Sequence, residues 1–317
     1  MAQSSPMKIA LVGIGKIARD QHVPSIAASP DWQLAATVSR NHSINGTESF
    51  RDVETMLEAR PDIEVVSLCM PPASRFAYAI ASIAAGRHVM LEKPPGATIS
   101  ECLQLKAKAQ EARVSIFATW HSRQAPQVAA AKMWLKDKRL HRLSVTWKED
   151  VRRWHPGQDW IWEPGGFGVF DPGINALSIL TEIVPDPVQL KGALLQFPAN
   201  RQTPIAASLT FRHPHADDVC ALFDWGEEGD QIWTIEAETS EGHMLLSGGG
   251  AELAIDGNKL PTPDQSGDPL NGEYPRLYAR MAELVRTGAI DMDIAPLALV
   301  ADAMLLGRRI AVEPFYA

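Results

Sequence analysis

Short apolar runs alternate with helix-like segments along the first third of the chain. The runs have the length and composition of buried strands, and the segments between them carry apolar residues at helical spacing. Such alternation predicts a doubly wound parallel sheet covered by helices. The expected strands open within residues 8–18 and lie at 33–41, 63–69, 88–93 and 114–119, and the expected helices begin near residue 16 and lie at 52–60, 75–85 and about 100–112.

The pattern changes after about residue 122. A helix-like segment at 127–138 comes first, and strand-like runs separated by Gly, Pro and Asp follow. Consecutive strands joined by short turns predict an α+β domain with a large, mostly antiparallel sheet. We therefore expect two domains, residues 1–122 and 123–317, with a C-terminal helix that packs back on the first. The expected strands of the second lie at 143–151, 190–197, 206–213, 220–225, 231–239 and 242–247, and helices at about 275–287 and 296–310 end the chain.

Composition narrows the class of protein. The chain has 317 residues, 45% of them hydrophobic and 21% charged, which is ordinary for two globular domains and excludes wholesale disorder. The net charge of −8, without a basic cluster, argues against nucleic acid and anionic membranes as partners. The three cysteines are scattered, so neither a disulfide framework nor a metal site is expected. The N-terminal segment has no apolar core of signal-peptide length before the first strand, no apolar run approaches the length of a membrane span, and we expect a cytoplasmic protein.

A glycine motif follows the first apolar run. Gly13, Gly15 and Ala18 form a G-x-G-x-x-A pattern, which is typical of the dinucleotide-binding turn of a Rossmann domain. Gly13 would make the tight turn, Gly15 would let a pyrophosphate approach, and Ala18 would let the helix pack on the sheet. The phosphates would lie on the helix N-terminus near Lys16. An ordinary glycine-rich turn is the alternative, but the flanking strand and helix favour a nucleotide.

The end of the second strand indicates which nucleotide. An acidic residue there usually binds the ribose 2′-hydroxyl of NAD, and this chain has Ser39 and Arg40 instead. A guanidinium and a hydroxyl suit a 2′-phosphate, so we expect NADP to be preferred and NAD tolerated. A solvated arginine at a strand end is the alternative.

Two further strands end abruptly at proline pairs. Cys69–Pro72 and Glu92–Pro95 should therefore lie at the carboxyl edge of the sheet, where ligands bind. Lys93 on that rim can act as a general acid or base, although a surface lysine is the alternative and Cys69 also suits the core. The residues expected to bind the cofactor are Gly13, Gly15, Lys16, Ile17, Ser39, Arg40, Cys69, Pro71, Pro72, Glu92 and Lys93.

A glycine-flanked segment, Gly165–Leu177, carries a second candidate group. Asp171 and Pro172 read as the N-cap and first residue of a helix, which would put Asp171 and Asn175 about one turn apart. Periodicity alone leaves open whether Asp171 is only a cap.

Tryptophans and charges concentrate in Trp147–Trp162, which contains four of the nine tryptophans. Indole faces beside polar side chains such as Glu149 and His155 suit a polyhydroxylated ligand. The alternative is a loop that buries its tryptophans between domains or subunits. His121, just past the last strand of the first domain, either faces the cleft or is a structural histidine.

These motifs, in this order, resemble the Gfo/Idh/MocA family of NAD(P)-dependent oxidoreductases. The resemblance rests on VGIGKIA, SLCMPP, HVMLEKPPGAT and the aspartate segment, and it covers essentially the whole chain. Within the family the chain is similar to the bacterial aldose 1-dehydrogenases that act on L-arabinose or D-galactose. The resemblance implies oxidation of an aldopyranose (L-arabinose, D-galactose or D-fucose) at C1 to the aldonolactone, with Lys93 and Asp171 as the catalytic pair. Its implied sugar contacts are Asn175, His121, Glu149, Trp154, His155 and Trp233.

One departure from the family concerns the base. Many members have histidine four residues after the aspartate, and here the residue is Asn175. An amide cannot accept the proton, so the base is Asp171 or Lys93, and we favour Asp171 beside Lys93. Other possibilities are a dihydrodiol-, inositol- or keto-sugar-type oxidoreductase and a non-catalytic NAD(P)/sugar sensor. A homodimer through the C-terminal sheet is expected by analogy with the architecture.

Overall fold

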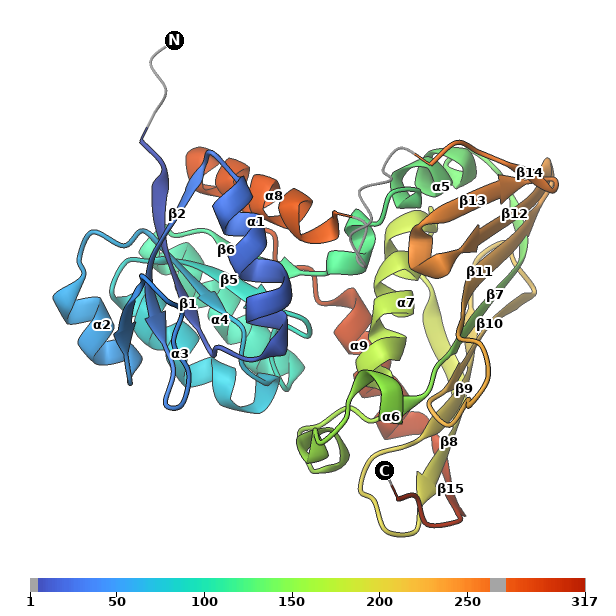
Figure 1. Ribbon diagram of the computed structural model, residues 1–317. Helices are drawn as coiled ribbons and strands as arrows, with labels where there is room; N and C mark the ends of the chain where they lie inside the picture. The colour runs from blue at the N-terminus through green and yellow to red at the C-terminus, as the bar shows by residue number, and fades with distance from the viewer. Residues whose placement is uncertain (1–4, 263–271, 317) are drawn as a thin grey trace. The chain divides into compact units, whose positions relative to one another are not determined.

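The computed structural model describes residues 5–262 and 272–316, which form two compact units (Figure 1). The first unit contains residues 1–121 and 274–294, and the second contains 122–273 and 295–317. The chain passes from the first unit to the second after His121, and helix α8 (Glu273–Thr287) belongs largely to the first unit, which is therefore discontinuous in sequence. Its buried face, with Tyr274, Leu277 and Tyr278, contacts residues that are distant in sequence, which local patterns cannot reveal.

The first unit is built on the expected parallel sheet. Its six strands follow the order β3-β2-β1-β4-β5-β6, and each neighbouring pair is parallel. The order reverses between β1 and β4, so their carboxyl ends form a topological switch point, where ligands bind in such sheets. The strands are β1 (Met7–Val12), β2 (Trp32–Val38), β3 (Glu48–Phe50), β4 (Val65–Leu68), β5 (His88–Glu92) and β6 (Ile116–Thr119). Only β3, three residues long, was not expected.

Helices follow the strands of the first unit as the pattern predicts. The first begins at Lys16, as expected, and includes a π-helical segment (Ala18–His22) before α1 (Val23–Ala28). The next helices are α2 (Val53–Ala59), α3 (Pro72–Ala84) and α4 (Ile99–Ala112). Asp52 caps α2 and Thr98 caps α4, since each side chain accepts a hydrogen bond from a backbone N–H group of the first turn. Helix α3 begins three residues earlier than expected, with proline at its first position.

The second unit is built on a nine-stranded sheet of order β14-β13-β12-β11-β7-β10-β9-β8-β15. It is mostly antiparallel, as expected, with parallel pairs only at β7/β10 and β8/β15. The strands are β7 (Leu140–Lys148), β8 (Gln189–Pro198), β9 (Ala206–Arg212), β10 (Asp218–Asp224), β11 (Ile232–Thr239), β12 (Gly242–Ser247), β13 (Glu252–Ile255), β14 (Asn258–Lys259) and β15 (Arg308–Val312).

The expected helix at 296–310 is too long. Helix α9 (Ala295–Leu306) ends before Gly307, where a Cβ atom would lie 2.4 Å from the carbonyl oxygen of Ala303. The chain then extends as β15 and pairs with β8. The expected helix therefore combined a helix with a strand.

Helices α5 (Val128–Leu135), α7 (Phe170–Ile183) and α9 contact one face of this sheet (Figure 1). The strands alternate accordingly: Val219, Ala221 and Phe223 are buried, whereas Leu222 between them is 39% exposed. Figure 1 draws no helix of the described chain over the other face, and the homodimer through it stays a prediction.

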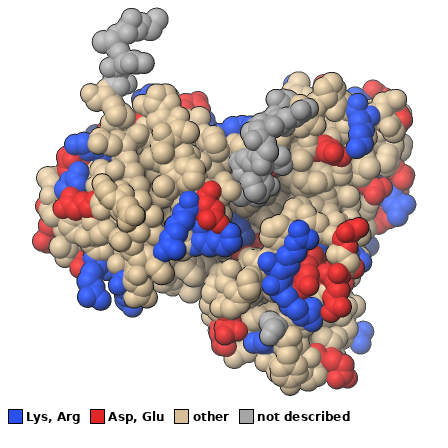
Figure 2. Space-filling model, in the orientation of Figure 1, with Lys and Arg blue, Asp and Glu red and all other residues tan. Residues whose placement is uncertain are grey.

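Two surface properties bear on possible partners. Among the described residues, no helix combines the length and the apolar composition that a membrane span requires. Figure 2 shows basic and acidic side chains interspersed over the visible face, without a broad area of one sign.

Candidate active site

The glycine turn at the end of β1 has the geometry that a dinucleotide cradle needs. Gly13 has φ +88°, and a Cβ atom there would lie 2.8 Å from the backbone nitrogen of Met70. A Cβ atom on Gly15 would meet nothing within 4 Å, so space is open where a phosphate group would approach. Ala18 is fully buried. Lys16 is exposed and pairs with Asp20.

The end of β2 leaves a positive charge accessible. The backbone N–H of Ser39 donates to the carbonyl of Phe50 at 3.0 Å, which holds β2 beside β3. Arg40 is exposed, and within the described parts of the chain it has no ion-pair partner. Its guanidinium is thus available for an anionic ligand.

The other expected cofactor residues divide between the surface and the interior. Ile17 is half-buried and Pro71 is exposed, whereas Pro72 is buried as the first residue of α3. Cys69 is also buried, and its N–H donates to the carbonyl of Val12 at 2.8 Å. The Cys69 side chain therefore lies in the core, which was the alternative for this residue.

Glu92, at the end of β5, is buried among donors from its own unit. Its Oε1 accepts from the Tyr274 hydroxyl at 2.7 Å and lies 2.9 Å from His22 Nε2, and its Oε2 accepts from the Lys93 N–H at 3.0 Å. Burial alone would raise the pKa of Glu92, but these hydrogen bonds and the nearby histidines lower that pKa to about 2. The Glu92 carboxylate thus supports the backbone of Lys93, and its contact with a cofactor stays a prediction.

His22 completes a buried cluster that sequence reasoning missed. Its Nδ1 lies 2.7 Å from the Tyr278 hydroxyl, and although burial disfavours the charged imidazolium, Cys69, Tyr278 and Glu92 raise the pKa of His22 well above its usual value. Burial raises the pKa of Tyr278 to about 12. His121 is also buried and stacks on the Tyr274 ring at 5.7 Å. No sequence signal links α8 to this cluster.

Lys93 itself is half-buried on the turn that follows β5, and its peptide bond to Pro94 is cis. A second missed residue, Arg75 of α3, is buried behind this turn. Its guanidinium donates to the carbonyl oxygens of Met70, Glu92 and Pro94. The backbone on both sides of Lys93 is therefore tied to one side chain.

In the second unit, Asp171 lies inside α7 and is not its N-cap. The chain turns at Gly168 (φ +52°), where a Cβ atom would lie 2.4 Å from the Pro204 carbonyl oxygen, and the helix begins at Phe170 after Val169 as N-cap. The expected N-cap was therefore wrong by two residues. Asp171 and Asn175 are nevertheless one turn apart, and within residues 170–180 Asn175 is the only one that is not buried.

The structure brings together Asp171 and His155, which we had placed separately. His155 follows the short helix α6 (Val151–Trp154), and its Nε2 lies 3.5 Å from Asp171 Oδ2. Its ring and that of Trp225 are in an edge-to-face arrangement, with centroids 5.2 Å apart. An imidazole thus stands beside this carboxylate, although the residue four positions after Asp171 is an asparagine.

Glu149 was expected to meet sugar hydroxyls, but its carboxylate holds indole rings. Its two oxygens accept from Trp225 Nε1 at 3.1 Å and Trp233 Nε1 at 3.0 Å. Trp233 stacks on Trp147 with ring centroids 5.6 Å apart. The ring of Trp154 is tilted against that of Trp233 with centroids 5.7 Å apart, and Trp154 is 38% exposed. The tryptophan-rich segment therefore contributes both a buried ring and an exposed one.

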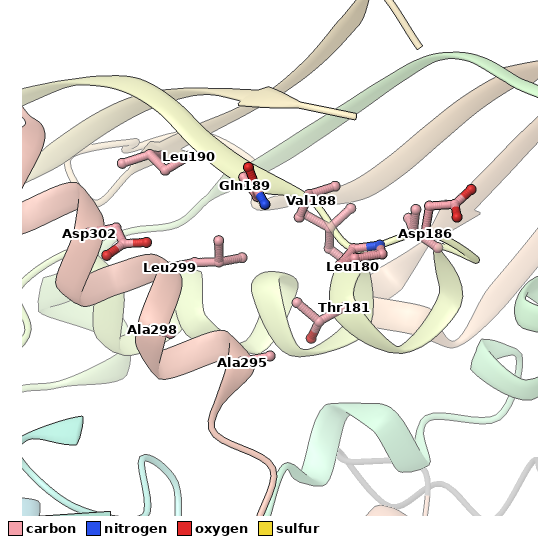
Figure 3. A pocket seen from close by; sticks show the side chains of 12 residues that line it. Leu180, Thr181, Asp186, Val188, Gln189, Leu190, Ala295, Ala298, Leu299 and Asp302 are labelled. Carbon is pink, nitrogen blue, oxygen red and sulfur yellow. The ribbon is translucent and has the colours of Figure 1, made fainter. Parts of the chain in front are cut away.

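A pocket of about 480 Å³ in the second unit lies apart from these residues (Figure 3). It is bounded by α7, β8 and α9, and its walls are apolar except for Thr181, Asp186, Gln189 and Asp302. None of the residues predicted as catalytic, sugar-binding or cofactor-binding lines it.

Comparisons with known proteins show which family this chain resembles. A family model described as an oxidoreductase family with an NAD-binding Rossmann fold matches residues 7–119. A galactose 1-dehydrogenase of Pseudomonas fluorescens is 42% identical over 312 residues, covering 98% of this chain and 99% of the relative. The crystal structure of a D-galactose-1-dehydrogenase from Rhizobium etli shares 52% identity, with a TM-score of 0.94 and full coverage of both chains.

A more distant structure shares the fold alone. A 3-ketoreductase from Actinomadura kijaniata is 17% identical, with a TM-score of 0.82 over 97% of this chain and 99% of that one. The Rossmann sheet, the Glu92-Lys93-Pro94 turn and the nearly full-length similarity lead to one conclusion. The chain belongs to the Gfo/Idh/MocA family of oxidoreductases.

Proposed function

We propose that this protein is an NAD(P)-dependent aldose 1-dehydrogenase that oxidises D-galactose, L-arabinose or D-fucose at C1 to the aldonolactone. The observation that carries the proposal is the full-length similarity to two galactose 1-dehydrogenases, at 42% and 52% identity. The chain also has Lys93 and Asp171, the pair that the family resemblance assigns to the sugar O1, with Asn175 one turn after Asp171.

The first unit offers groups that would bind a nicotinamide dinucleotide. We assign the pyrophosphate to the open space at Gly15 and the adjoining helix N-terminus, and a 2′-phosphate to Ser39 and Arg40. When bound, the nicotinamide accepts the hydride that leaves C1 of the sugar. An accessible guanidinium at this position favours NADP over NAD.

We assign the proton of the sugar O1 hydroxyl to Asp171. As the O1–H bond breaks, the proton passes to the carboxylate, and the electron pair of that bond forms the C1=O bond while the C1–H pair leaves as hydride. Asp171 lies in the first turn of α7, where the helix dipole favours its ionised form. Lys93 would stabilise negative charge that develops on O1, and Asn175 would orient the sugar by hydrogen bonding.

His155 gives the proton an onward route. The His155 Nε2 atom lies 3.5 Å from Asp171 Oδ2, close enough to accept the proton from that carboxyl group after a small movement. The His155 side chain is 19% exposed, although its Nδ1 atom is buried. We therefore assign His155 to proton transfer as well as to the sugar pocket.

The aromatic side chains would bind the sugar ring. The exposed Trp154 beside Trp233 offers indole faces for the C–H face of a pyranose. D-Galactose, D-fucose and L-arabinose share ring stereochemistry and differ at C5. A pocket that leaves the space beyond C5 unfilled would discriminate among them by only about 1–3 kcal/mol.

Steady-state rates with a panel of aldoses, inositols and dihydrodiols, each with NAD and NADP, test the proposal. Turnover of D-galactose and L-arabinose is expected, with Asp171→Ala and Lys93→Ala both strongly impaired. Full activity of Asp171→Ala with loss in Lys93→Ala would make lysine the base. No measurable turnover of any compound, together with tight cofactor binding, would contradict the proposal and favour a sensor. Turnover of inositols or dihydrodiols alone would change the substrate class.

Cofactor preference has its own test. Arg40→Ala should lower kcat/KM for NADP about 10-fold and leave NAD unchanged, because it removes a charge-assisted contact to the 2′-phosphate. Lys108→Ala, which removes an exposed charge from the same unit, is the matched control. Equal losses with both cofactors in Arg40→Ala would contradict the assignment.

A further inference from the structure

We propose that Arg75 is a positioning residue for the reaction: its guanidinium fixes the turn that carries Lys93 relative to the glycine turn of the nucleotide site. The inference rests on the proposed function, since it gives Lys93 a place in the reaction. Arg75 itself need not touch the sugar or the cofactor.

The turn at Lys93 is short of backbone donors. Strand β5 ends at Glu92, and the residues after Lys93 are Pro94 and Pro95, neither of which has an N–H group. The turn thus presents carbonyl acceptors but lacks two of the donors with which a chain normally ties itself down. A donor from elsewhere is needed to fix it.

Arg75 supplies those donors from α3. One terminal nitrogen, Nη1, donates to the carbonyl oxygens of both Glu92 and Pro94, the residues on either side of Lys93. The other, Nη2, donates to the carbonyl oxygen of Met70. Because a guanidinium is planar and its donors are fixed relative to one another, the three carbonyls are held as one unit.

Met70 connects this group of three carbonyls to the glycine turn. The backbone of Met70 is so close to Gly13 that a Cβ atom on Gly13 would lie 2.8 Å from the Met70 nitrogen. Gly13 is in turn held by its N–H donating to the Val38 carbonyl at 2.9 Å. The guanidinium therefore lies between the turn that bears Lys93 and the turn proposed to bind the pyrophosphate.

Packing alone does not account for an arginine at this position. Arg75 is 1% exposed, and burial lowers the pKa of its guanidinium to about 10, although the charge of Glu92 partly opposes this. The residue stays charged at neutral pH at a cost in desolvation that an apolar side chain of similar volume would avoid. The donors to the three carbonyls are what the apolar side chain would lack.

The decisive variant is Arg75→Lys, which keeps the charge and loses the planar fork. We expect kcat for D-galactose to fall about 10-fold or more, because a small displacement of Lys93 spoils its alignment with O1. The Kd of NADP should stay within about 3-fold, since the glycine turn keeps its own hydrogen bond to β2. Rates are expressed per cofactor-binding site, so that loss of folded protein does not count.

Arg60→Lys is the matched control. Arg60 donates to the Ala35 carbonyl and pairs with Glu48 and Asp62 in the same unit, before β4 and not after it. We expect its kcat to stay within about 2-fold of the parent. An equal fall in both variants would overturn the proposal, because it would show general sensitivity to arginine loss.

A second readout is independent of activity. After reductive ¹³C-methylation, the dimethyl signal of Lys93, assigned by its absence in Lys93→Arg, should shift in Arg75→Lys and not in Arg60→Lys. An unshifted signal, or a kcat within about 2-fold of the parent, would overturn the proposal. Arg75→Gln replaces Arg75→Lys if the lysine variant is unstable. If neither variant binds cofactor, Arg75 is needed for stability, and the proposal is overturned as well. If the parent oxidises no aldose, the proposed function fails while the Lys93 signal still decides the role of Arg75.

Discussion

In the first unit Lys93 stands on a turn that depends on side chains from other segments, whereas in the second unit Asp171 stands in the first turn of a 14-residue helix. The turn is fixed by Arg75 from α3 and by Glu92, which is itself held by His22 and Tyr274. The helix is fixed by its own hydrogen bonds and by a buried surface that includes Phe170 and Ile174. Substitutions remote from Lys93 should therefore affect catalysis, whereas near Asp171 the residue itself should dominate.

The largest effect is expected at Asp171. Asp171→Asn should lower kcat by about 10²–10⁴-fold, because the amide cannot accept the O1 proton. Because asparagine has nearly the shape of aspartate, the variant should still fold, and its melting temperature checks this. Rates and thermal melts of the same preparation test the expectation. A fall in kcat of less than about 10-fold would exclude Asp171 as the base.

The second effect concerns stability of the first unit. His22→Asn leaves Glu92 as a buried charge without its cationic partner, which should cost about 3–5 kcal/mol of unfolding free energy. The variant lacks the histidine whose pKa is raised in the folded protein. The difference in unfolding free energy from the parent should therefore be largest below pH 6.5 and shrink as the pH rises through that raised pKa. The lowered pKa of Glu92 contributes stability above pH 4.5, which disappears as the pH falls toward 2.

Denaturant unfolding of parent and His22→Asn across pH measures this difference. The expected maximum lies between pH 4.5 and 6.5, the usual pKa values of the two side chains. A difference that grew steadily above pH 6.5 would contradict the assignment of a charged His22. His141→Asn on the exposed part of β7 is the control and should show no such profile.

The glycine turn offers a pair of substitutions that separates folding from binding. Gly13→Ala should destabilise the first unit, because φ is +88° and Met70 leaves no room for a Cβ atom. Gly15→Ala should leave stability within about 0.5 kcal/mol and raise the KM of NADP about 10-fold, since its added methyl group meets only open space. Unchanged cofactor KM in Gly15→Ala would remove the pyrophosphate from this position.

The smallest effect is expected at Glu149. Glu149→Gln keeps one acceptor oxygen and turns an NH₂ group toward an indole N–H, so Trp233 should lose its fixed orientation. The KM for sugar should rise about 5-fold with little change in kcat, as for loss of uniform binding. Glu228→Gln, at a side chain that is 76% exposed, is the control. A fall in kcat with unchanged KM would instead place Glu149 in the chemistry.

The parallel sheet, the glycine turn and the position of Lys93 could be predicted from the sequence, because each depends on residues that are neighbours along the chain. Short strands such as β14 have too few residues to form a pattern. Arg75 and His22 resemble ordinary polar residues of amphipathic helices, and only tertiary contacts show that they are buried. The N-cap was misplaced because Asp-Pro is a strong local signal, whereas the turn at Gly168 depends on Pro204, which is far along the chain.

The placement of residues 274–294 has a consequence for biosynthesis. During translation the six strands of the first unit emerge early, but the hydroxyl groups of Tyr274 and Tyr278 that meet Glu92 and His22 emerge about 150 residues after β6. Until then the nascent sheet would expose the surface that α8 later covers. The first unit can therefore finish folding only when almost the whole protein has been synthesised.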